Sequence, residues 1–413
     1  MFRSLKYYNL RLFLAGQLCS LIGTWLQIVA GSWLIYRLTN SALLLGFFAF
    51  ALNFPALIFA PLAGVAADRF DRRSLLVLVN TLAMVQAFIL WVLVYSGKVQ
   101  IWHIMLLSVL LGILNAYEMT IRQSLISKMI DEPKDLSNAI ALNSSVFNGS
   151  RLFGPAIAGV TIAVFGESIC FLLNALSFLP IIAALCLMRL PYVRPPRTLS
   201  SKKSLIEGFS YVYHSMPIRL LLIMVSVLSM LSGAFNALAP VFAKEIFGGG
   251  PKTLGLILSC SGMGALSGAM YLASRKSVIG LGRVAAVAAA GASVSLMMFA
   301  LVPDIRYAVV TIYFSGLAMI MSIGGMNVII QTLADEEKRG RVMSLYAIAL
   351  VGISPIGSLA AGAIASHAGV VTALFAIAST AFIASIFFWF RLPVFRSHVR
   401  PLYAAKGIVP ETP

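Results

Sequence analysis

The sequence predicts an all-α integral membrane protein with twelve transmembrane helices in two pseudo-symmetric six-helix halves. The first observation is composition: 60% of the 413 residues are hydrophobic and only 11% are charged, whereas a soluble domain carries about 25% charged residues. The second is length, because apolar runs of about 20 residues recur, which suits membrane helices rather than the shorter strands of a barrel. The third is the alternation of Lys and Arg between successive loops.

Polar breaks cut the apolar sequence into twelve spans, and the longest break separates the first six from the last six. We therefore expect an N-terminal six-helix bundle at 1–190, a cytoplasmic linker at 191–217, a C-terminal bundle at 218–391 and a cytoplasmic tail at 392–413. The first apolar run is long and has no signal-peptide cleavage site, so we expect it to remain as the first span. The twelve spans are expected near 10–36, 42–66, 74–97, 101–127, 137–163, 168–190, 218–243, 253–274, 284–302, 307–331, 342–366 and 369–391.

The distribution of Lys and Arg sets the expected orientation. With both termini and the even-to-odd loops in the cytoplasm, 25 of the 31 basic residues fall on the inner side, as the positive-inside rule requires. This pattern explains the net charge of +17 without nucleic acid as a partner, whereas a basic tail for anionic lipid would explain only the C-terminus. The remaining basic residues are Arg37, Lys98, Lys244, Lys252 and Arg306 in outer loops and Arg151 within a span.

The two halves resemble each other weakly. RQSL at 122–125 and IQTL at 330–333 end spans four and ten, and an acidic cluster follows each. These matches occur in one order and indicate duplication, and two six-span repeats are typical of transporters with a substrate site between them near the midplane. Three glycines in span five and three in span eleven have the same mutual spacing: Gly154, Gly159, Gly166 and Gly357, Gly362, Gly369.

The loop after span two, GVAADRFDRR at 64–73, is short, dense in charge and expected on the inner face. Its glycine lets a neighbouring helix approach, and a carboxylate beside arginines can cap a helix or form an ion pair. Such contacts can form in one conformation and break in another, which makes the loop a candidate gate; a generic positive-inside loop explains the arginines only. The candidate gating residues are Gly64, Asp68, Arg69, Arg72 and Arg73.

Span five contains NGSRLFGPAIAG at 148–159. Pro155 removes one backbone hydrogen bond, which allows the helix to bend. Gly154 and Gly159 let a neighbouring helix come close. We therefore expect a bendable and tightly packed segment here.

Given these motifs and the twelve-span layout, nearly the whole chain resembles the major facilitator superfamily. GVAADRFDRR is similar to the signature of its loop between spans two and three, with Asp71 where a glycine is common, and GPAIAG at 154–159 is similar to the GPxxGG signature of its antiporters, with Ala158 replacing one glycine. SLIGTWLQ (20–27), LTNSALLLG (38–46) and the run from RGRVMSLY to PIG (339–357) resemble the branch containing the bacterial enterobactin exporter and drug-efflux proteins. The resemblance implies alternating-access transport in the bacterial inner membrane, commonly export coupled to proton entry.

Proton coupling requires a titratable group inside the membrane. Many members of the resembled branch carry a carboxylate in the first span, where this chain has Thr24, and of its 14 acidic residues only Glu118 lies within a span. An ionised carboxylate is disfavoured there, but Arg122 lies one helical turn away and can pair with it. Deprotonation favours the pair and protonation releases it, so this pair is a candidate for proton coupling; a static ion pair and direct substrate contact are the alternatives.

Arg151 is the other charge within a span, and it requires a partner or a polar cavity. Three interpretations stay open: it pairs with Glu118, it meets an anionic group of the substrate, or it reaches the membrane surface. In the resembled family, spans one, four, seven and ten line the substrate cavity. Their polar residues are candidates for substrate contact, although each can equally bond to a neighbouring helix: Gln17, Gln27, Asn115, Asn236 and Asn327.

No enzyme motif is present. The chain has no phosphate-binding GxxxxGK[ST] loop and no G-x-S-x-G, and its His and Cys residues do not have metal-ligand spacing. We therefore expect no catalytic residues, no cofactor and no metal, and we do not expect ATP to drive the protein directly.

The sequence thus predicts a secondary transporter: a proton-coupled antiporter that exports small organic molecules such as a siderophore, a drug (multidrug efflux) or another amphipathic metabolite. The scarcity of carboxylates in the spans favours neutral or anionic substrates over cations. We expect a monomer that interacts with its substrate, protons and membrane lipid. The alternatives are an importer or lysolipid flippase of the same fold and, in another class, a non-transporting receptor or assembly factor, against which the gate and span-five motifs argue.

Overall fold

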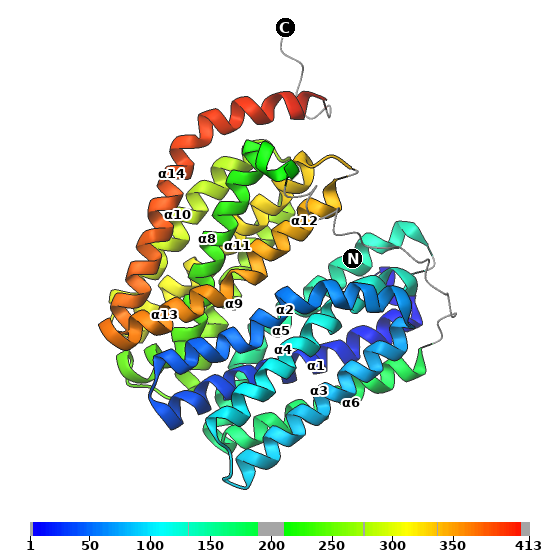
Figure 1. The fold of residues 1–413 in the computed structure, drawn as a ribbon, viewed down its shortest axis with the longest axis vertical. Helices are drawn as coiled ribbons and strands as arrows, with labels where there is room; N and C mark the ends of the chain where they lie inside the picture. The colour runs from blue at the N-terminus through cyan, green and yellow to red at the C-terminus, as the bar shows by residue number, and fades with distance from the viewer. Residues whose placement is uncertain (1–2, 131, 189–209, 276, 337, 406–413) are drawn as a thin grey trace. The chain divides into compact units, whose positions relative to one another are not determined.

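The computed structural model describes residues 3–130, 132–188, 210–275, 277–336 and 338–405. Within these ranges all regular structure is helical (Figure 1). The predicted tail continues as helix to residue 405, while most of the predicted linker, 191–209, and residues 406–413 lie outside the described residues. The long helices of the first sequence half are α1 (Tyr8–Thr39), α2 (Ala42–Arg69), α3 (Arg72–Tyr95), α4 (Ile101–Ile126), α5 (Leu136–Phe165) and α6 (Glu167–Leu187).

The helices of the second sequence half include two short π-helical turns. One follows α8 directly, and the other divides predicted span eleven into α12 and α13. In chain order the elements are α8 (Met216–Val241), η4 (Phe242–Ile246), α9 (Pro251–Ser274), α10 (Leu281–Leu301), α11 (Ile305–Leu333), α12 (Arg339–Ala347), η5 (Ile348–Gly352), α13 (Ser354–Ala368) and α14 (Val370–Ala405).

Eleven stretches of the described helices are long and apolar enough to cross a membrane, with α12, η5 and α13 forming one of them. The chain is therefore a multi-pass membrane protein. Helix α5 is not among the eleven although it has 30 residues. Polar side chains lie along its first half, including Asn143, Ser145, Asn148 and Arg151. These residues lower its apolar character.

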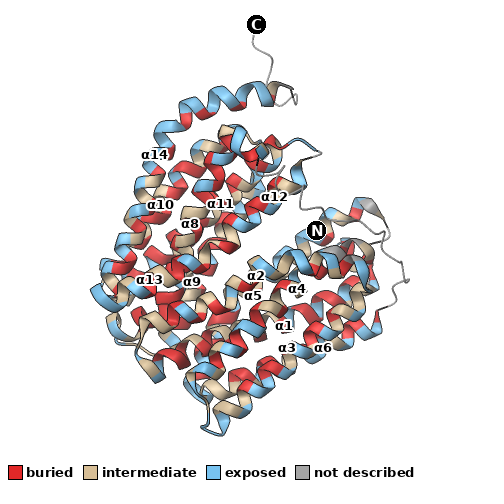
Figure 2. Ribbon diagram, viewed as in Figure 1, coloured by how far each residue is buried: buried red, intermediate tan, exposed pale blue. Residues whose placement is uncertain are grey.

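The chain forms two compact units. Unit 1 comprises Met1–Leu199 and Ala239–Gly262, and unit 2 comprises Ser200–Leu238 and Met263–Pro413. The segment Ala239–Gly262, which the sequence division places in the second half, thus packs with the helices of the first half. In each unit, most helices have a buried side and an exposed side (Figure 2), which is the pattern expected when the outer surface faces lipid.

In unit 1, α1 packs against α5 and α6, α3 against α4 and α6, and α2 against α4. Near one end of the helices the core contains Phe13, Leu76, Ile121 and Phe178, each at most 5% exposed. Gly16 of α1 and Gly112 of α4 allow close backbone contact, because an added Cβ would lie within 2.7 Å of α6 or α2 backbone. The same bundle carries most of the predicted site residues.

The glycines that repeat between the halves occupy equivalent structural positions. Gly166 ends α5 with φ +80°, and Gly369 ends α13 with φ +83°. Glycine suits both positions because other residues adopt a positive φ only with strain. Gly154 of α5 packs against the side chain of Trp25 of α1, and Gly357 of α13 packs against the backbone of Met230 of α8, so each glycine allows a close contact with another helix.

Candidate transport site

The predicted gating loop anchors helices within unit 1. Asp71 caps α3 by accepting a hydrogen bond from the backbone N–H of Ser74 at 2.8 Å, which is a usual role for Asp at a helix start. Arg73 donates to the carbonyl oxygens of Met188, at 3.0 Å, and Cys186 at the end of α6, where a cation also matches the helix dipole. Arg72 donates to the carbonyl of Ala67 at 3.2 Å.

The remaining gating candidates have different surroundings. Arg69 is exposed. Among the described residues, no atom lies within 4 Å of a Cβ built on Gly64. The side chain of Asp68 lies outside the described part of the chain. A sequence signal for the α3 cap was available, since Asp71 precedes Ser74 by the spacing of a capping residue.

Glu118 and Arg122 lie together on α4, with Arg122 Nη1 at 3.5 Å from Glu118 Oε1. Their side chains are 19% and 6% exposed, so both are largely shielded from solvent. Arg122 Nε and Nη1 are buried and form no hydrogen bond with any described residue. Buried guanidinium groups without hydrogen bonds are costly, and the contact is longer than a strong charge-assisted hydrogen bond. The ion pair between Glu118 and Arg122 is therefore weak.

Arg151 on α5 is half-buried and forms no ion pair or hydrogen bond with any described side chain. In particular it does not pair with Glu118, whose partner is Arg122. The backbone at Arg151 contacts α9, because a Cβ on Gly262 would lie 2.9 Å from the Arg151 carbonyl oxygen. Of the three interpretations of Arg151, pairing with Glu118 is not realised in this structure.

The span-five motif forms a close contact between α5 and the start of α9, both within unit 1. A Cβ on Gly159 would lie 2.7 Å from the carbonyl oxygen of Pro251 and 3.0 Å from Cα of Gly255. A Cβ on Gly255 would lie 2.6 Å from the carbonyl oxygen of Pro155. Two glycines thus face each other, and the proline lies beside them, which explains why this stretch carries small residues.

Gln27 takes part in a buried chain of amides. Its side chain accepts from Asn174 on α6 at 2.6 Å and donates to Gln86 on α3 at 3.1 Å. Gln86 in turn donates to the Leu107 carbonyl on α4 at 3.1 Å. The three amide side chains are at most 4% exposed, so the amide of Gln27 links helices. Gln27 also lines a small cavity between α1, α2, α3 and α4.

The other polar candidates are spread over both units. In unit 1, Gln17 of α1 is buried and Asn115 of α4 is half-buried. In unit 2, Asn236 of α8 is exposed and bonds to the Ser232 carbonyl at 2.8 Å, and Asn327 of α11 accepts from Gln331 at 2.9 Å. Asn115 and Gln17 thus share a unit with Glu118, Arg122 and Arg151.

Sequence reasoning missed a buried carboxylate at the start of α5. Asp135 accepts from Arg3 Nε at 2.6 Å and from the Tyr7 hydroxyl at 3.0 Å, and it pairs with Lys6 Nζ at 2.9 Å. Its side chain is 0% exposed. These hydrogen bonds, above all that from Lys6, hold the pKa of Asp135 well below its usual range. The basic N-terminus and the DEPKD cluster were visible in the sequence, but their proximity was not.

A second group of contacts that sequence reasoning missed joins the end of α1 to η4, directly after α8, within unit 1. The Tyr36 hydroxyl donates to Glu245, and Lys244 Nζ donates to Asn40 Oδ1 at 2.7 Å. Lys244 also lies 5.2 Å from the centre of the Tyr36 ring. Asn40 adopts φ +46° where α1 ends, and η4 carries Lys244 and Glu245. These contacts, together with the glycines of α5 and α9, hold Ala239–Gly262 in unit 1.

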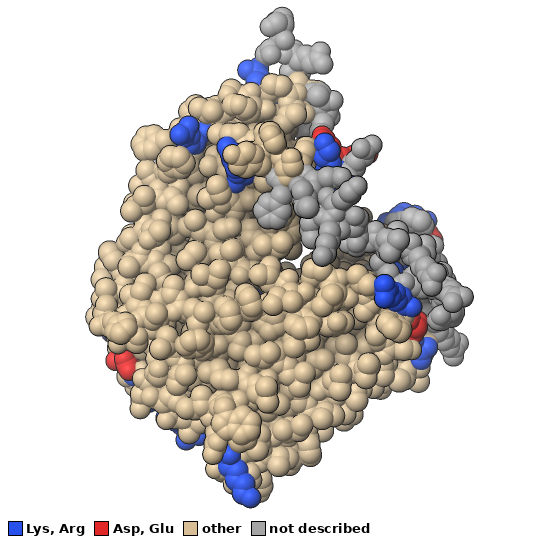
Figure 3. Space-filling model, in the orientation of Figure 1, with Lys and Arg blue, Asp and Glu red and all other residues tan. Residues whose placement is uncertain are grey.

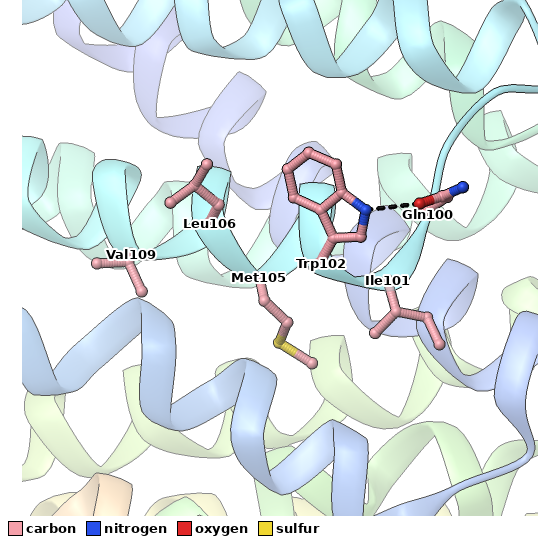
Figure 4. Close-up of a pocket in the computed structure, with 6 residues that line it drawn as sticks. All are labelled: Gln100, Ile101, Trp102, Met105, Leu106 and Val109. Carbon is pink, nitrogen blue, oxygen red and sulfur yellow. Dashed lines mark hydrogen bonds between the residues drawn. The ribbon is translucent and has the colours of Figure 1, made fainter.

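A surface pocket of about 780 Å³ lies on the first turns of α4, away from these groups. It is lined by Gln100, Ile101, Trp102, Met105, Leu106 and Val109 (Figure 4). One helix and its preceding residue supply the whole lining, and the only polar contact drawn is Trp102 Nε1 donating to Gln100 Oε1 at 2.6 Å. It contains no predicted site residue.

Eleven long apolar stretches among the described helices define a multi-pass membrane protein. The family described as "Transmembrane secretion effector" matches residues 2–406, and the chain belongs to this family within the major facilitator superfamily.

Named relatives match over most of the chain. The staphyloferrin A transporter of Staphylococcus aureus is 26% identical, covering 87% of this chain and 90% of its own. The multidrug efflux pump Tap of Mycolicibacterium fortuitum is also 26% identical with the same coverage. Macrolide efflux protein A of Streptococcus pyogenes is 22% identical, covering 89% of this chain and 91% of its own. The chain is thus similar to membrane transporters and is not an enzyme.

Solved structures share the fold at low sequence identity. The nucleoside transporter NupG aligns with a TM-score of 0.76 and 12% identity, covering 92% of this chain and 98% of that one. A bacterial homologue of the lysosomal transporter Spinster, in an inward-facing and unoccupied conformation, aligns with a TM-score of 0.72 and 14% identity, covering 95% and 98%. These likenesses establish the major facilitator type of fold.

Proposed function

We propose that the protein exports a small organic molecule across the bacterial inner membrane in exchange for protons, by alternating access. The observation that carries this proposal is the Glu118–Arg122 pair, a carboxylate and a guanidinium 3.5 Å apart and largely shielded within α4. The names of the relatives, which include a siderophore transporter and efflux proteins, support a small amphipathic substrate.

The pair provides a switch that responds to one proton. When Glu118 is ionised it attracts Arg122, and when it is protonated the attraction falls to that of a neutral group. Arg122 then has buried N–H groups free to bond elsewhere, because Nε and Nη1 have no hydrogen bond with the described residues. A proton on Glu118 therefore changes the free-energy difference between two arrangements of α4, which is what coupling requires.

Arg151 favours an anionic substrate group over a cationic one. Its guanidinium has no ion-pair partner among the described side chains, and an unpaired arginine in a membrane helix costs about 2.5–3.5 kcal/mol on insertion scales. A carboxylate or phosphate of the substrate would supply the missing partner in bidentate geometry. Gln17, Asn115, Asn236 and Asn327 complete the proposed set of substrate contacts.

The topology belongs to the same proposal. Helix α5 also crosses the membrane and, with the eleven candidate stretches, gives twelve spans. Both termini are cytoplasmic, as the distribution of Lys and Arg indicates. The loop at 64–73 acts as an inner gate, and the protein works as a monomer.

The coupling step is tested with Glu118→Gln in inverted membrane vesicles. Substrate should make the lumen of wild-type inverted vesicles less acidic, because protons leave as substrate enters. Glu118→Gln should lose at least about tenfold of the pH-gradient-driven rate, the typical scale for loss of a proton-transfer group. Glu118→Asp keeps the carboxylate and should retain part of the rate. Full gradient-driven transport by Glu118→Gln would contradict the proposal.

The substrate and direction are tested by metabolite profiling of culture medium. A deletion strain should lack, or contain less of, one organic compound that the complemented strain releases. Uptake of that compound by right-side-out vesicles would indicate an importer, and competition by lysolipid would indicate a flippase. Absence of any difference, together with no proton flux in proteoliposomes, would favour a non-transporting role.

A further inference from the structure

Helix α14 is longer than a membrane crossing requires. Its 36 residues correspond to about 54 Å at 1.5 Å per residue, against a hydrocarbon core of about 30 Å. The apolar run ends at the aromatic residues Trp389 and Phe390, which are 44% and 73% exposed and suit a membrane interface. The helix continues past them as RLPVFRSHVRPLYAA, residues 391–405, and Figure 1 shows it changing direction in this last part.

This last part of α14 is amphipathic and anchored to unit 2. Leu392, Phe395, Val399 and Tyr403 share one face of the helix and are 3–8% exposed. A Cβ on Gly282, at the start of α10, would lie 3.3 Å from the Phe395 ring. Residues 391–405 are therefore packed against unit 2 along one face, and most side chains on the other faces are exposed.

The exposed sides carry positive charge, and Arg391 lies 5.2 Å from the centre of the Phe387 ring. Arg391, Arg396 and Arg400 are exposed, and none forms an ion pair with a described residue. No acidic residue occurs between Lys338 and Glu411 in the sequence, so carboxylates close in the chain do not neutralise them. On the face shown in Figure 3, Lys and Arg side chains lie near the end of α14, and the flank of α14 below them carries no charge.

Exposed apolar side chains lie among these arginines. Val394 and Leu402 are 42% and 39% exposed. A helix with one side on protein, apolar residues on a free side and arginines beside them matches the pattern of helices that lie in the membrane interface. Arginines there attract anionic lipid headgroups, and long side chains can reach the headgroup level while their stems remain in apolar surroundings.

We propose that residues 391–405 form an interfacial helix that recruits anionic phospholipid from the leaflet surrounding this end of α14, through Arg391, Arg396 and Arg400. Each arginine near the surface strengthens the preference for anionic over neutral lipid by about fivefold, so three together contribute on the order of 100-fold. The proposal is independent of the transported substrate.

The test uses Trp389, next to the first arginine, as a local reporter. The full chain is reconstituted in phosphatidylcholine liposomes containing a minor fraction of lipid with brominated acyl chains, which quench tryptophan only at short range. The part of the quenching that disappears in Trp389→Phe is assigned to Trp389. In the wild type, brominated phosphatidylglycerol should quench Trp389 more than the same fraction of brominated phosphatidylcholine, and salt should reduce the excess.

The variants separate charge at this helix from charge elsewhere. Replacing Arg391, Arg396 and Arg400 with Gln should abolish the excess quenching, and replacing them with Lys should keep most of it. Replacing Lys98, Lys252 and Arg306 with Gln removes the same net charge at other exposed positions and should leave the excess unchanged. If the triple Gln variant does not insert, the single variants Arg396→Gln and Arg400→Gln should each reduce the excess by about fivefold in binding preference.

Two results would overturn the proposal. One is an unchanged excess of quenching by phosphatidylglycerol in an inserted, helical triple Gln variant. The other is loss of the excess in the wild type on adding soluble glycerol phosphate at constant ionic strength, which would indicate a site for a free phosphate group rather than for bilayer lipid.

Discussion

At the residue scale, two shielded carboxylates of unit 1, Asp135 and Glu118, have different surroundings. Asp135 has three donor side chains within 3.0 Å, whereas Glu118 has one arginine at 3.5 Å. The first is fixed in its ionised form by strong hydrogen bonds, and the second is only weakly held. The proposed proton site is therefore Glu118, and Asp135 serves to anchor the N-terminal residues to the start of α5.

We predict that Asp135→Asn lowers the melting temperature by several degrees, because Arg3 and Lys6 lose their common partner. The folded-state pKa of Asp135 is lowered, so its stabilisation is present above the unfolded-state pKa of about 3.9 and is lost only as pH falls through the acidic range. The difference between variant and wild type should thus be constant from about pH 5 to 8, as thermal unfolding in detergent would reveal. The exposed pair of Asp304 with Arg306 provides a control, and Asp304→Asn should have little effect.

We predict that replacing Arg151 reduces transport without reducing stability. Arg151→Gln should leave the melting temperature unchanged or raise it, because no ion pair with a described residue is lost and a half-buried charge is removed. Transport of an anionic substrate should fall by at least about tenfold, the scale of one charged hydrogen-bonding group, and Arg151→Lys should recover part of it. A marked loss of stability in Arg151→Gln would instead point to a structural partner.

At the element scale, α5 contains two glycines that allow a matched comparison. A Cβ on Gly159 meets backbone at 2.7 Å, whereas nothing lies within 4 Å of a Cβ on Gly149. Gly159→Ala should therefore separate α5 from α9 and destabilise the protein by about 1–3 kcal/mol. Gly149→Ala should be neutral or stabilise it by up to about 1 kcal/mol, because alanine favours helix. Equal effects of the two substitutions would argue against the close α5–α9 contact.

Helices α5 and α13 each end at a glycine for a conformational reason. Gly166 and Gly369 both have positive φ, so alanine at either position forces a strained backbone that costs about 1–2 kcal/mol. Nothing lies within 4 Å of a Cβ at either position, so the strain alone explains why glycine recurs there. The positive φ that Gly166 and Gly369 share supports a common origin of the two halves more strongly than their equal spacing in the sequence.

At the scale of the whole molecule, the proposed membrane orientation predicts that the two ends of α5 lie on opposite sides of the membrane. In a chain without its native cysteines, Lys134→Cys and Phe165→Cys lie at opposite ends of α5, and both positions are exposed. In intact cells a membrane-impermeant thiol reagent should label Phe165→Cys and not Lys134→Cys, with the reverse in inverted vesicles. Labelling of both from one side would remove α5 from the spans and contradict the twelve-span topology.

The sequence alone indicated most of the helices, the family and a multi-pass membrane protein, because each depends on local patterns. It did not indicate the division of predicted span eleven by η5 or the extension of α14 to residue 405. Apolar runs of membrane length, charged loops such as 64–73 and small residues around Pro155 can be read without knowing which helices touch. The cap by Asp71 and the glycine-terminated ends of α5 and α13 also depend on local patterns, but we did not predict them from the sequence. Glu118 and Arg122 were also found from the sequence, because four-residue spacing brings side chains together on any helix.

The tertiary structure decided what each polar group contacts, because partners distant in the sequence are set by packing. It joined Asp135 to Arg3 and Lys6 across more than 120 positions, tied Tyr36 and Asn40 to the end of α8, and committed Gln27 to an amide chain between helices. It also placed Glu118 against Arg122 rather than Arg151, so pairing with Glu118, one of three interpretations open from the sequence, is not realised in this structure. A pattern in sequence fixes which face of a helix a residue occupies, but only the folded chain determines what lies opposite that face.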